Sequence, residues 1–358
     1  MTRQDAVSDH KVRVLIVDDS PAILNLLKVG FSRHPQIEIV GTAQDPYEAR
    51  EKIKQLNPDV MTLDVEMPRM NGLDFLERIM RLRPMPVVMF SSITPEGSQA
   101  AVRALALGAV DVQVKPAQGI DAHFLNDLAE RVVTAAESRR VRAKPVQGLR
   151  DVTVKQDVAT LQQWNGKIVL IGASTGGVAA LEAVLNGLPA NAPPLVIAQH
   201  MPESFLASFA QRLNQRSRLR VQIARDGDVI SQGGVYLAAG GTRHLTVERQ
   251  GRHFLCRDKE GPKRNGHHPS VDELFFSAVD FAESVVGTIL TGLGRDGADG
   301  LKALHDAGAR TIGQNAESCV VYGMPRAAFD LGAVDGQFAL KDIAFEICRC
   351  ADKRSGRV

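Results

Sequence analysis

Short apolar runs separated by longer segments of helical spacing recur along the chain in two series, and this alternation constrains the fold more than any other feature. Each run has the length of a strand, and each intervening segment is long enough for a crossover helix, as in parallel β-α-β units. The first series comprises residues 12–17, 37–43, 59–64, 86–92 and 110–115. It predicts a doubly wound α/β domain with a mostly parallel sheet.

The second series predicts another α/β domain. Its apolar runs are residues 167–172, 194–200 and 285–292, and the glycine-containing stretch GGVYLAAGGTRHLTVER (233–249) between them reads as a β-hairpin. We expect a Rossmann-like, mostly parallel sheet of the α/β hydrolase type with an added hairpin. No repeat of fixed period is apparent, which disfavours solenoid folds.

The length of 358 residues suits two domains of ordinary size. We place the first domain at residues 11–130 and the second at 165–353. Residues 131–164 carry basic side chains among small and polar residues, with Pro145 and Gly148 as breakers, and read as a linker. The basic cluster is either a solvated segment or a docking segment, and the sequence leaves both readings open.

Composition restricts the cellular setting more than the partners. A net charge of +2 gives no reason to expect a nucleic-acid or membrane surface. The four cysteines lack metal-ligand spacing, and the first ten residues contain no apolar signal-peptide core. No uncharged apolar stretch approaches the roughly 20 residues that span a bilayer. We therefore expect a cytoplasmic protein with reduced thiols and no membrane insertion.

Charged residues end three strands of the first series: Asp18 and Asp19, then Asp64, then Lys115. The carboxyl ends of parallel strands line one crevice, where three carboxylates need a cation such as Mg²⁺. Asp64 is then placed to attack phosphorus and form an aspartyl phosphate, with Lys115 and Ser91 bonding the phosphoryl oxygens. Taken singly each acid is equally a helix cap, but the set favours the cation site.

These residues lie in the strings DD, LDVEMPRMNG, FSS and VKP, which together resemble the receiver domain of two-component response regulators over residues 11–130. The resemblance implies a flavodoxin-like fold and a switch at Ser91. It also implies Mg²⁺ held by Asp19, Asp64 and the carbonyl of Glu66, with Asp18 acting through water. Many receivers carry an aromatic residue where this chain has Val112, so an aromatic relay does not carry over.

Three further strand ends carry the chemistry of acyl transfer. Ser174 lies in the glycine-rich turn GASTGG between a strand and a helical segment, where helix amides face incoming negative charge. His200 ends the next strand and fits the base, and Asp296 follows a later strand and fits the group that orients the base. Each residue alone is more often a cap, a turn residue or a structural histidine.

Alternatives to this triad remain on the sequence. Asp299 competes with Asp296, and five histidines compete with His200: His244, His253, His267, His268 and His305. Two other enzyme classes fit less well. The order serine, histidine, aspartate differs from that of α/β-hydrolases, and GASTGG lacks the pattern of a dinucleotide-binding loop.

Five strings in one order, IGASTGG, AQHMPESFLASFAQRLN, HHPSVDELF, ILTGLGRDGADG and CVVYGMPRAAF, resemble the chemotaxis protein-glutamate methylesterases. The resemblance spans about residues 165–340. It implies catalytic roles for Ser174, His200 and Asp296, and oxyanion or supporting roles for residues in the two glycine-rich loops: Thr175, Gly176, Gly177 and Leu293. Many members have Met where this chain has Leu293.

The resemblance further implies the activity: hydrolysis of glutamyl methyl esters on methyl-accepting chemotaxis receptors, glutamine deamidation, and activation through phosphorylation by a chemotaxis-type histidine kinase. The ester chemistry itself needs no cofactor. A non-enzymatic signalling module, whose second domain only binds a partner, is the alternative. A DNA-binding output domain would need a helix-turn-helix with a basic face, which the strand-rich second half does not offer.

Overall fold

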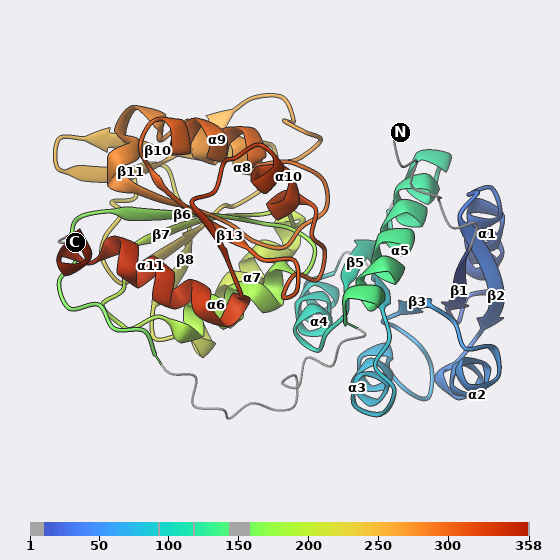
Figure 1. Cartoon of the computed structure of the whole chain (residues 1–358). Helices are drawn as coiled ribbons and strands as arrows, with labels where there is room; N and C mark the ends of the chain where they lie inside the picture. The colour runs from blue at the N-terminus through green and yellow to red at the C-terminus, as the bar shows by residue number, and fades with distance from the viewer. Residues whose placement is uncertain (1–10, 92–93, 117–118, 143–157, 357–358) are drawn as a thin grey trace, which may run out of the picture. The chain divides into compact units, whose positions relative to one another are not determined.

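The chain folds into two compact units, Met1–Ala143 and Lys144–Val358 (Figure 1). The computed structural model describes residues 11–91, 94–116, 119–142 and 158–356. Both units are α/β, and the two predicted sheets of mostly parallel strands are confirmed.

The first unit has a five-stranded parallel sheet of order β2-β1-β3-β4-β5. Its strands match all five predicted runs: β1 (Val12–Val17), β2 (Ile37–Ala43), β3 (Val60–Asp64), β4 (Val87–Ser91) and β5 (Asp111–Val114). The strand order reverses between β1 and β3. Such a reversal opens a crevice at the carboxyl ends of the strands.

Helices connect these strands and begin with their own caps. The helices are α1 (Pro21–Ser32), α2 (Pro46–Leu56), α3 (Gly72–Leu82), α4 (Pro95–Ala106) and α5 (Ala122–Arg142). Ser20, Asp45 and Asn71 each accept a backbone N–H of the helix that follows. Helix α1 packs against α5, and α3 packs against α4.

The linker predicted at residues 131–164 is shorter at both ends. The helix runs to Arg142, so residues 131–142 continue the first unit, because buried Val132, Val133 and Ala136 extend its apolar face. At the other end, the Ala159 N–H donates to the Gly187 carbonyl, and Trp164 bridges to Asp352, so residues 158–164 belong to the second unit. Pro145 and Gly148 lie outside the described residues.

The second unit is built on a seven-stranded parallel sheet of order β14-β13-β12-β6-β7-β9-β8. The predicted runs form β6 (Ile168–Ala173), β7 (Leu195–Gln199) and β12 (Val285–Ile289), which lie side by side at the centre. Four strands lie outside them: β8 (Arg220–Ile223), β9 (Gly234–Leu237), β13 (Arg310–Gln314) and β14 (Gly336–Phe338).

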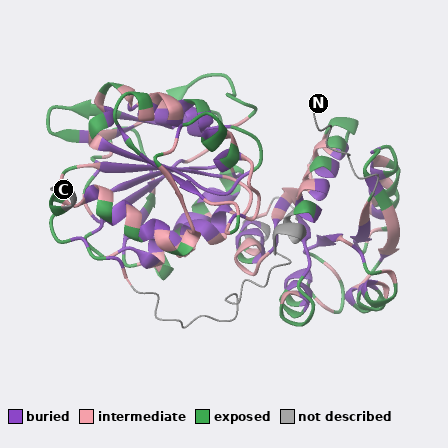
Figure 2. Cartoon of the chain, in the orientation of Figure 1, coloured by how far each residue is buried: buried purple, intermediate pink, exposed green. Residues whose placement is uncertain are grey.

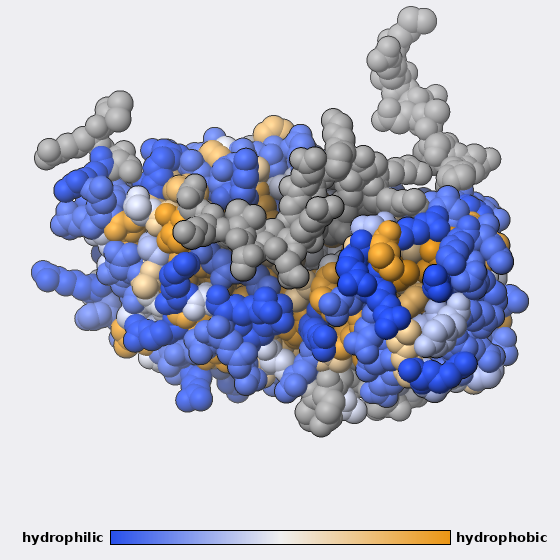
Figure 3. Space-filling model, turned by 90° about the horizontal axis from the view of Figure 1, so that it is seen from below, coloured by the Kyte–Doolittle hydropathy of each residue, from blue (hydrophilic) through white to orange (hydrophobic). Residues whose placement is uncertain are grey.

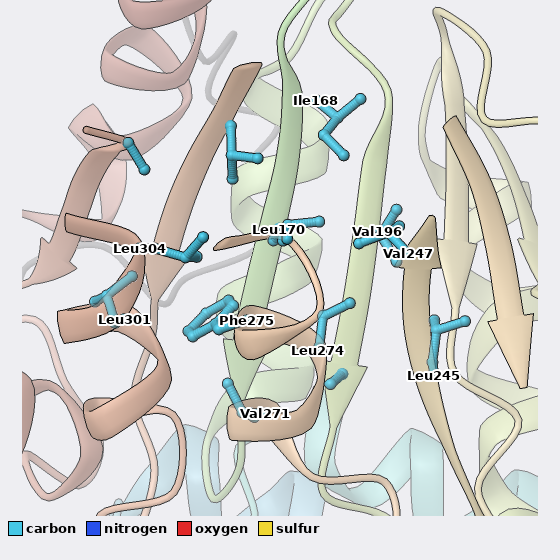
Figure 4. Close-up of a cluster of buried hydrophobic side chains, with 14 of the residues drawn as sticks. Ile168, Leu170, Val196, Leu245, Val247, Val271, Leu274, Phe275, Leu301 and Leu304 are labelled. Carbon is cyan, nitrogen blue, oxygen red and sulfur yellow. The ribbon is translucent and has the colours of Figure 1, made fainter. Parts of the chain in front are cut away.

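Helices cover both faces of this sheet (Figure 1). One face carries α6 (Gly177–Gly187), α7 (Glu203–Arg216) and α11 (Ile343–Ala351); the other carries α8 (Val271–Phe276), α9 (Ala298–Asp306) and α10 (Met324–Asp330). The central strands are buried along their length, whereas the covering helices carry half-buried or exposed residues as well as buried ones (Figure 2). Side chains such as Leu170, Val196, Phe275 and Leu301 fill the α8–α9 face (Figure 4).

The predicted hairpin was placed wrongly. Residues 234–237 form β9 inside the parallel sheet, and the antiparallel hairpin pairs β10 (Arg243–Gln250) with β11 (His253–Glu260). All four residues of β9 are buried, which fits an inner parallel strand rather than the arm of a solvent-facing hairpin.

On the face seen in Figure 3, hydrophilic residues dominate the described surface and apolar side chains appear in small groups between them. Among the described residues, no helix has the length and apolar character needed to cross a membrane.

Candidate active site

Ser174 immediately follows β6 and begins the turn into α6. Its N–H donates to the Thr291 carbonyl at 3.0 Å, and its own carbonyl accepts the Gly177 N–H at 2.7 Å. Between them Gly176 has a φ of 80°, in the left-handed region that favours glycine. The half-buried serine is thus held at the carboxyl edge of the sheet by backbone bonds to two loops.

Close packing explains a second glycine of the site. A Cβ added at Gly292, in the loop after β12, would lie 2.8 Å from the Ser174 Cβ and would also meet Met324. The loop that carries Asp296 therefore runs directly against the Ser174 turn. A side chain at position 292 would push these two segments apart.

His200 follows β7, the neighbour of β6. Its Nε2 lies 2.8 Å from Oδ2 of Asp296, and its side chain is 6 % exposed. Its Nδ1 is buried and meets no hydrogen-bond partner within the described part of the chain. One imidazole nitrogen is thus engaged by a carboxylate, and the other is left to take a proton.

Buried Gln199 ties the two loops together, a role that no sequence motif indicates. Its side-chain amide donates to the carbonyls of Ser174 and His200, each at 3.0 Å. A Cβ at Gly177 would collide with the same amide. This side chain thus adds to the backbone bond from the His200 N–H to the Ala173 carbonyl in fixing the spacing between the serine turn and the histidine strand end.

Asp296 is 1 % exposed and accepts hydrogen bonds from several elements. Besides His200, it accepts the Val271 N–H at 2.7 Å, the Ser270 hydroxyl at 2.8 Å and the Asn265 amide at 2.9 Å. Burial alone would raise the pKa of Asp296. The bonds from His200, Asn265 and Val271 outweigh burial and hold that pKa well below its usual range.

The competing aspartate and histidines lie in other settings. Asp299 is exposed and pairs with Arg295 at 2.7 Å. His244 accepts the Ser270 N–H through Nδ1 and bonds the Pro262 carbonyl through Nε2. His268 bonds the Gly261 carbonyl, His253 begins β11, and His305 lies beside Asp306 on α9. His267 alone touches His200, stacked at 3.7 Å between ring centroids.

The residues predicted to support an oxyanion lie around Ser174. The Thr175 carbonyl accepts the Thr291 hydroxyl at 2.9 Å, and Gly176 and Gly177 start α6, whose first turn has no side-chain cap. The positive end of this helix faces the serine loop. Leu293 is 36 % exposed, at the surface of the loop that carries Asp296.

The second predicted site lies at the carboxyl ends of β1 and β3. Ligand oxygens of Asp18, Asp19 and Asp64 lie within 4.8 Å of one another, with Asp18 and Asp64 buried and Asp19 exposed. Lys115 Nζ lies 2.9 Å from Asp64 and 3.2 Å from Asp18. Burial raises the pKa of Asp64 to about 6 although Lys115 opposes it, as expected for crowded carboxylates that suit a divalent cation.

The other predicted receiver residues are Glu66, Ser91 and Val112. Glu66 is exposed, and its backbone N–H bonds the Asp64 carboxylate. Ser91 ends β4, but its side chain lies outside the described residues. Val112 is buried in β5, while Lys115 Nζ lies 5.0 Å from the ring centroid of Phe90.

Comparison with known proteins identifies a family for each unit. Residues 169–347 match the model of the CheB methylesterase family, and residues 14–123 match the response regulator receiver domain. The crystal structure of the Thermotoga maritima CheB methylesterase catalytic domain aligns with a TM-score of 0.50 at 35% identity, covering 51% of this chain and 97% of that chain.

Several relatives match this chain over nearly its whole length. A protein of Agrobacterium fabrum is 50% identical over 344 residues, covering 96% of this chain and 97% of its own. One of Caulobacter vibrioides is 48% identical over 345 residues, covering 96% and 99%. Both are named protein-glutamate methylesterase/protein-glutamine glutaminase, and the name of the Caulobacter protein adds the number 1. The chain therefore belongs to the CheB family of protein-glutamate methylesterase/protein-glutamine glutaminases and joins its hydrolase domain to a response regulator receiver domain.

Proposed function

We propose that Ser174, His200 and Asp296 form the catalytic triad of this esterase, and that its substrates are glutamyl methyl esters on chemotaxis receptors. The observation that carries the assignment is the His200–Asp296 bond at 2.8 Å. This bond engages Nε2 of His200 and leaves its buried Nδ1 to act as the base. His200 follows β7, which pairs with β6, the strand that precedes Ser174. These residues come from three adjacent strands of one sheet.

The reaction follows from this placement. The Ser174 oxygen attacks the γ-carbonyl carbon while its proton passes to His200 Nδ1, and the tetrahedral intermediate expels methoxide, which takes that proton and leaves as methanol. Water attacks the acyl-serine with the same proton route and releases the glutamate. Helix α6 amides stabilise the oxyanion, and one such donor is worth roughly 10²- to 10³-fold in rate. A glutamine substrate releases ammonia in place of methanol.

The test is methanol release from methylated receptor membranes. Ser174→Ala is expected to abolish it, whereas Ser217→Ala, a serine at the end of α7, is expected to retain it. Retention of the wild-type rate in Ser174→Ala would remove the nucleophile assignment. Loss of the rate in both variants would point to general disruption of the fold instead.

In the receiver, Asp19, Asp64 and the Glu66 carbonyl are proposed to hold Mg²⁺, with Asp18 acting through water. Magnesium supplies charge neutralisation for the incoming phosphoryl group. Asp64 is the proposed phosphoacceptor, and Lys115 is placed to pair with a phosphoryl oxygen because it already spans Asp64 and Asp18. Ser91 is the proposed switch.

Phosphorylation of Asp64 by a chemotaxis-type histidine kinase is proposed to raise esterase activity. The receiver is fused to the hydrolase, so the charge added at Asp64 can shift the chain toward its active conformation. Methanol release should rise with phosphodonor and Mg²⁺, and Asp64→Asn should lack that rise while keeping its basal rate. Equal rates with and without phosphodonor in the wild type would refute the link. We also infer a cytoplasmic location, because receptor methylation sites and kinases of this class face that compartment.

A further inference from the structure

The loop between β11 and α8 brings an asparagine between two buried carboxylates. Asn265 Nδ2 lies 2.9 Å from Oδ1 of Asp296 and 2.7 Å from Oδ2 of Asp272. A side-chain amide nitrogen carries two hydrogens. Each carboxylate therefore receives one of them, and the full donor capacity of Asn265 is used by this pair.

Asp272 is as deeply buried as the catalytic aspartate, at 1 % exposed. Its Oδ1 accepts the Gly300 N–H at 2.7 Å, in the first turn of α9, and its own N–H donates to Asp296 at 3.3 Å. This anchorage fixes Asp272 relative to both helices. The carboxylate has no role in the triad, yet it reaches the triad through Asn265.

The charges around Asp272 are mostly of its own sign. Burial, with the charges of Asp296 and Asp299 adding to it, raises the pKa of Asp272 to about 6. Arg264 is the cation near the pair, but it bonds Glu273 at 2.6 Å. His200 reaches the pair only through Asp296. The Asn265 amide is thus the group that separates two like charges.

The same loop touches the histidine. Asn265 has a φ of 52°, Arg264 ties the loop to Glu273 on α8, and His267 lies stacked over His200. Lys259 also bonds Glu273, at 2.7 Å, from β11. Both members of the His200–Asp296 pair are therefore contacted by one ten-residue loop, 261–270, that α8 holds in place.

We propose that Asn265 and Asp272 are positioning residues of the esterase: Asn265 clamps the carboxylate of Asp296 so that Oδ2 faces His200, and Asp272 fixes the clamp. The proposal rests on the proposed role of Asp296. Neither residue is placed to touch substrate, so the expected effect is on turnover rather than on substrate binding.

The chain offers matched variants for Asn265. Glycine keeps the left-handed backbone and removes only the amide, while aspartate tolerates the same backbone and turns a third carboxylate toward the pair. We expect Asn265→Gly to lower kcat about 10-fold and Asn265→Asp about 100-fold, with KM unchanged. Asn57→Gly is the control, because Asn57 also has positive φ, at 46°, but caps α2 in the receiver.

Asp272→Asn tests the anchor of the clamp. Its oxygen can still accept the Gly300 N–H, but its NH₂ group then faces the Asn265 NH₂ group in place of a carboxylate oxygen, so the clamp loses this partner. We expect kcat to fall in this variant with KM unchanged, and both constants to stay in place in Asn57→Gly. A residue that only capped α9 would leave kcat unchanged.

The experiment is methanol release by the full chain from methylated receptor membranes, without phosphodonor, for these variants and Ser174→Ala. An inactive Ser174→Ala with equal kcat for wild type, Asn265→Gly and Asn265→Asp would overturn this inference alone. Full activity of Ser174→Ala would instead overturn the proposed triad. Circular dichroism and urea midpoints verify folding, and an aspartate variant no slower than the glycine variant would also refute the clamp.

Discussion

His200 meets Asp296 through Nε2 rather than Nδ1, at 2.8 Å. In the proposed role of His200 as base, the competent tautomer carries its hydrogen on Nε2 and leaves the buried Nδ1 unprotonated. A carboxylate that accepts the Nε2 hydrogen holds this tautomer and stabilises the imidazolium that forms during proton transfer.

Asp296→Asn is expected to lower kcat by roughly 10⁴-fold, because an amide at this position would favour the wrong tautomer of His200. The NH₂ group would also face the Val271 N–H or the Ser270 hydroxyl, donors that now bond the carboxylate. Methanol release under saturating receptor measures the change. Asp299→Asn is the control; if it were the more damaging variant, Asp299 rather than Asp296 would be the partner of the base.

Asp296→Asn should also make the free energy of unfolding depend less on pH in the acid range. The pKa of Asp296 is lowered in the folded chain, so the ionised carboxylate adds stability that is fully present above the unfolded value, near 4, and is lost as pH falls through the folded value. The difference in unfolding free energy between wild type and Asp296→Asn should thus be largest at neutral pH and shrink below about pH 4. Urea denaturation at several pH values measures it; a constant difference would contradict the assignment.

Gly176→Ala is expected to destabilise the second unit by about 2 to 4 kcal/mol. The left-handed φ of 80° accounts for about 1 to 2 kcal/mol, and overpacking against Val320, 2.5 Å from the added Cβ, accounts for the rest. Gly251→Ala, in the β10–β11 turn at φ 59° with nothing within 4 Å, carries the backbone cost alone. Equal losses of unfolding free energy in the two variants would rule out the clash.

Millimolar Mg²⁺ is expected to raise the melting temperature of the receiver unit, because a ligand that binds only the folded state stabilises it. Asp19→Ala removes an exposed ligand oxygen of the cluster without opening the core and should abolish the rise. Asp74→Ala, an exposed acid in the first turn of α3, should keep it. Differential scanning calorimetry with and without Mg²⁺ decides between them, and a rise that survives in Asp19→Ala would place the ion elsewhere.

Prediction from sequence succeeded where a signal is local. Alternating apolar runs and helical segments are set by neighbours in the chain, and all five receiver strands and the three central strands of the second sheet were predicted. The short strands β13 and β14 were not predicted because they hold few consecutive apolar residues. The hairpin was misplaced because the glycine pair after β9 imitates a hairpin turn.

The site was predictable only at strand ends. Ser174 and His200 stand directly after apolar runs, and Asp296 lies in the loop that follows a third run, so parallel topology predicts that they gather at one edge. Gln199, Ser270 and Asn265 carry no such signal. Their roles depend on carbonyls and carboxylates that are remote in the chain, such as Asn265 on Asp296, 31 positions away.

The three strands before the triad residues, β12, β6 and β7, are consecutive neighbours in mid-sheet, where Ile289 pairs with Gly172 and Ala173 pairs with Gln199. A single inserted or deleted residue in any of them would turn the terminal side chain to the opposite face of the sheet. Within the sheet of the second unit, tolerance to length changes should therefore be lowest in the middle strands and highest in the outermost strands, β8 and β14. A scan of single-residue insertions should show the greatest loss of activity in β12, β6 and β7, the strands that precede the proposed catalytic residues.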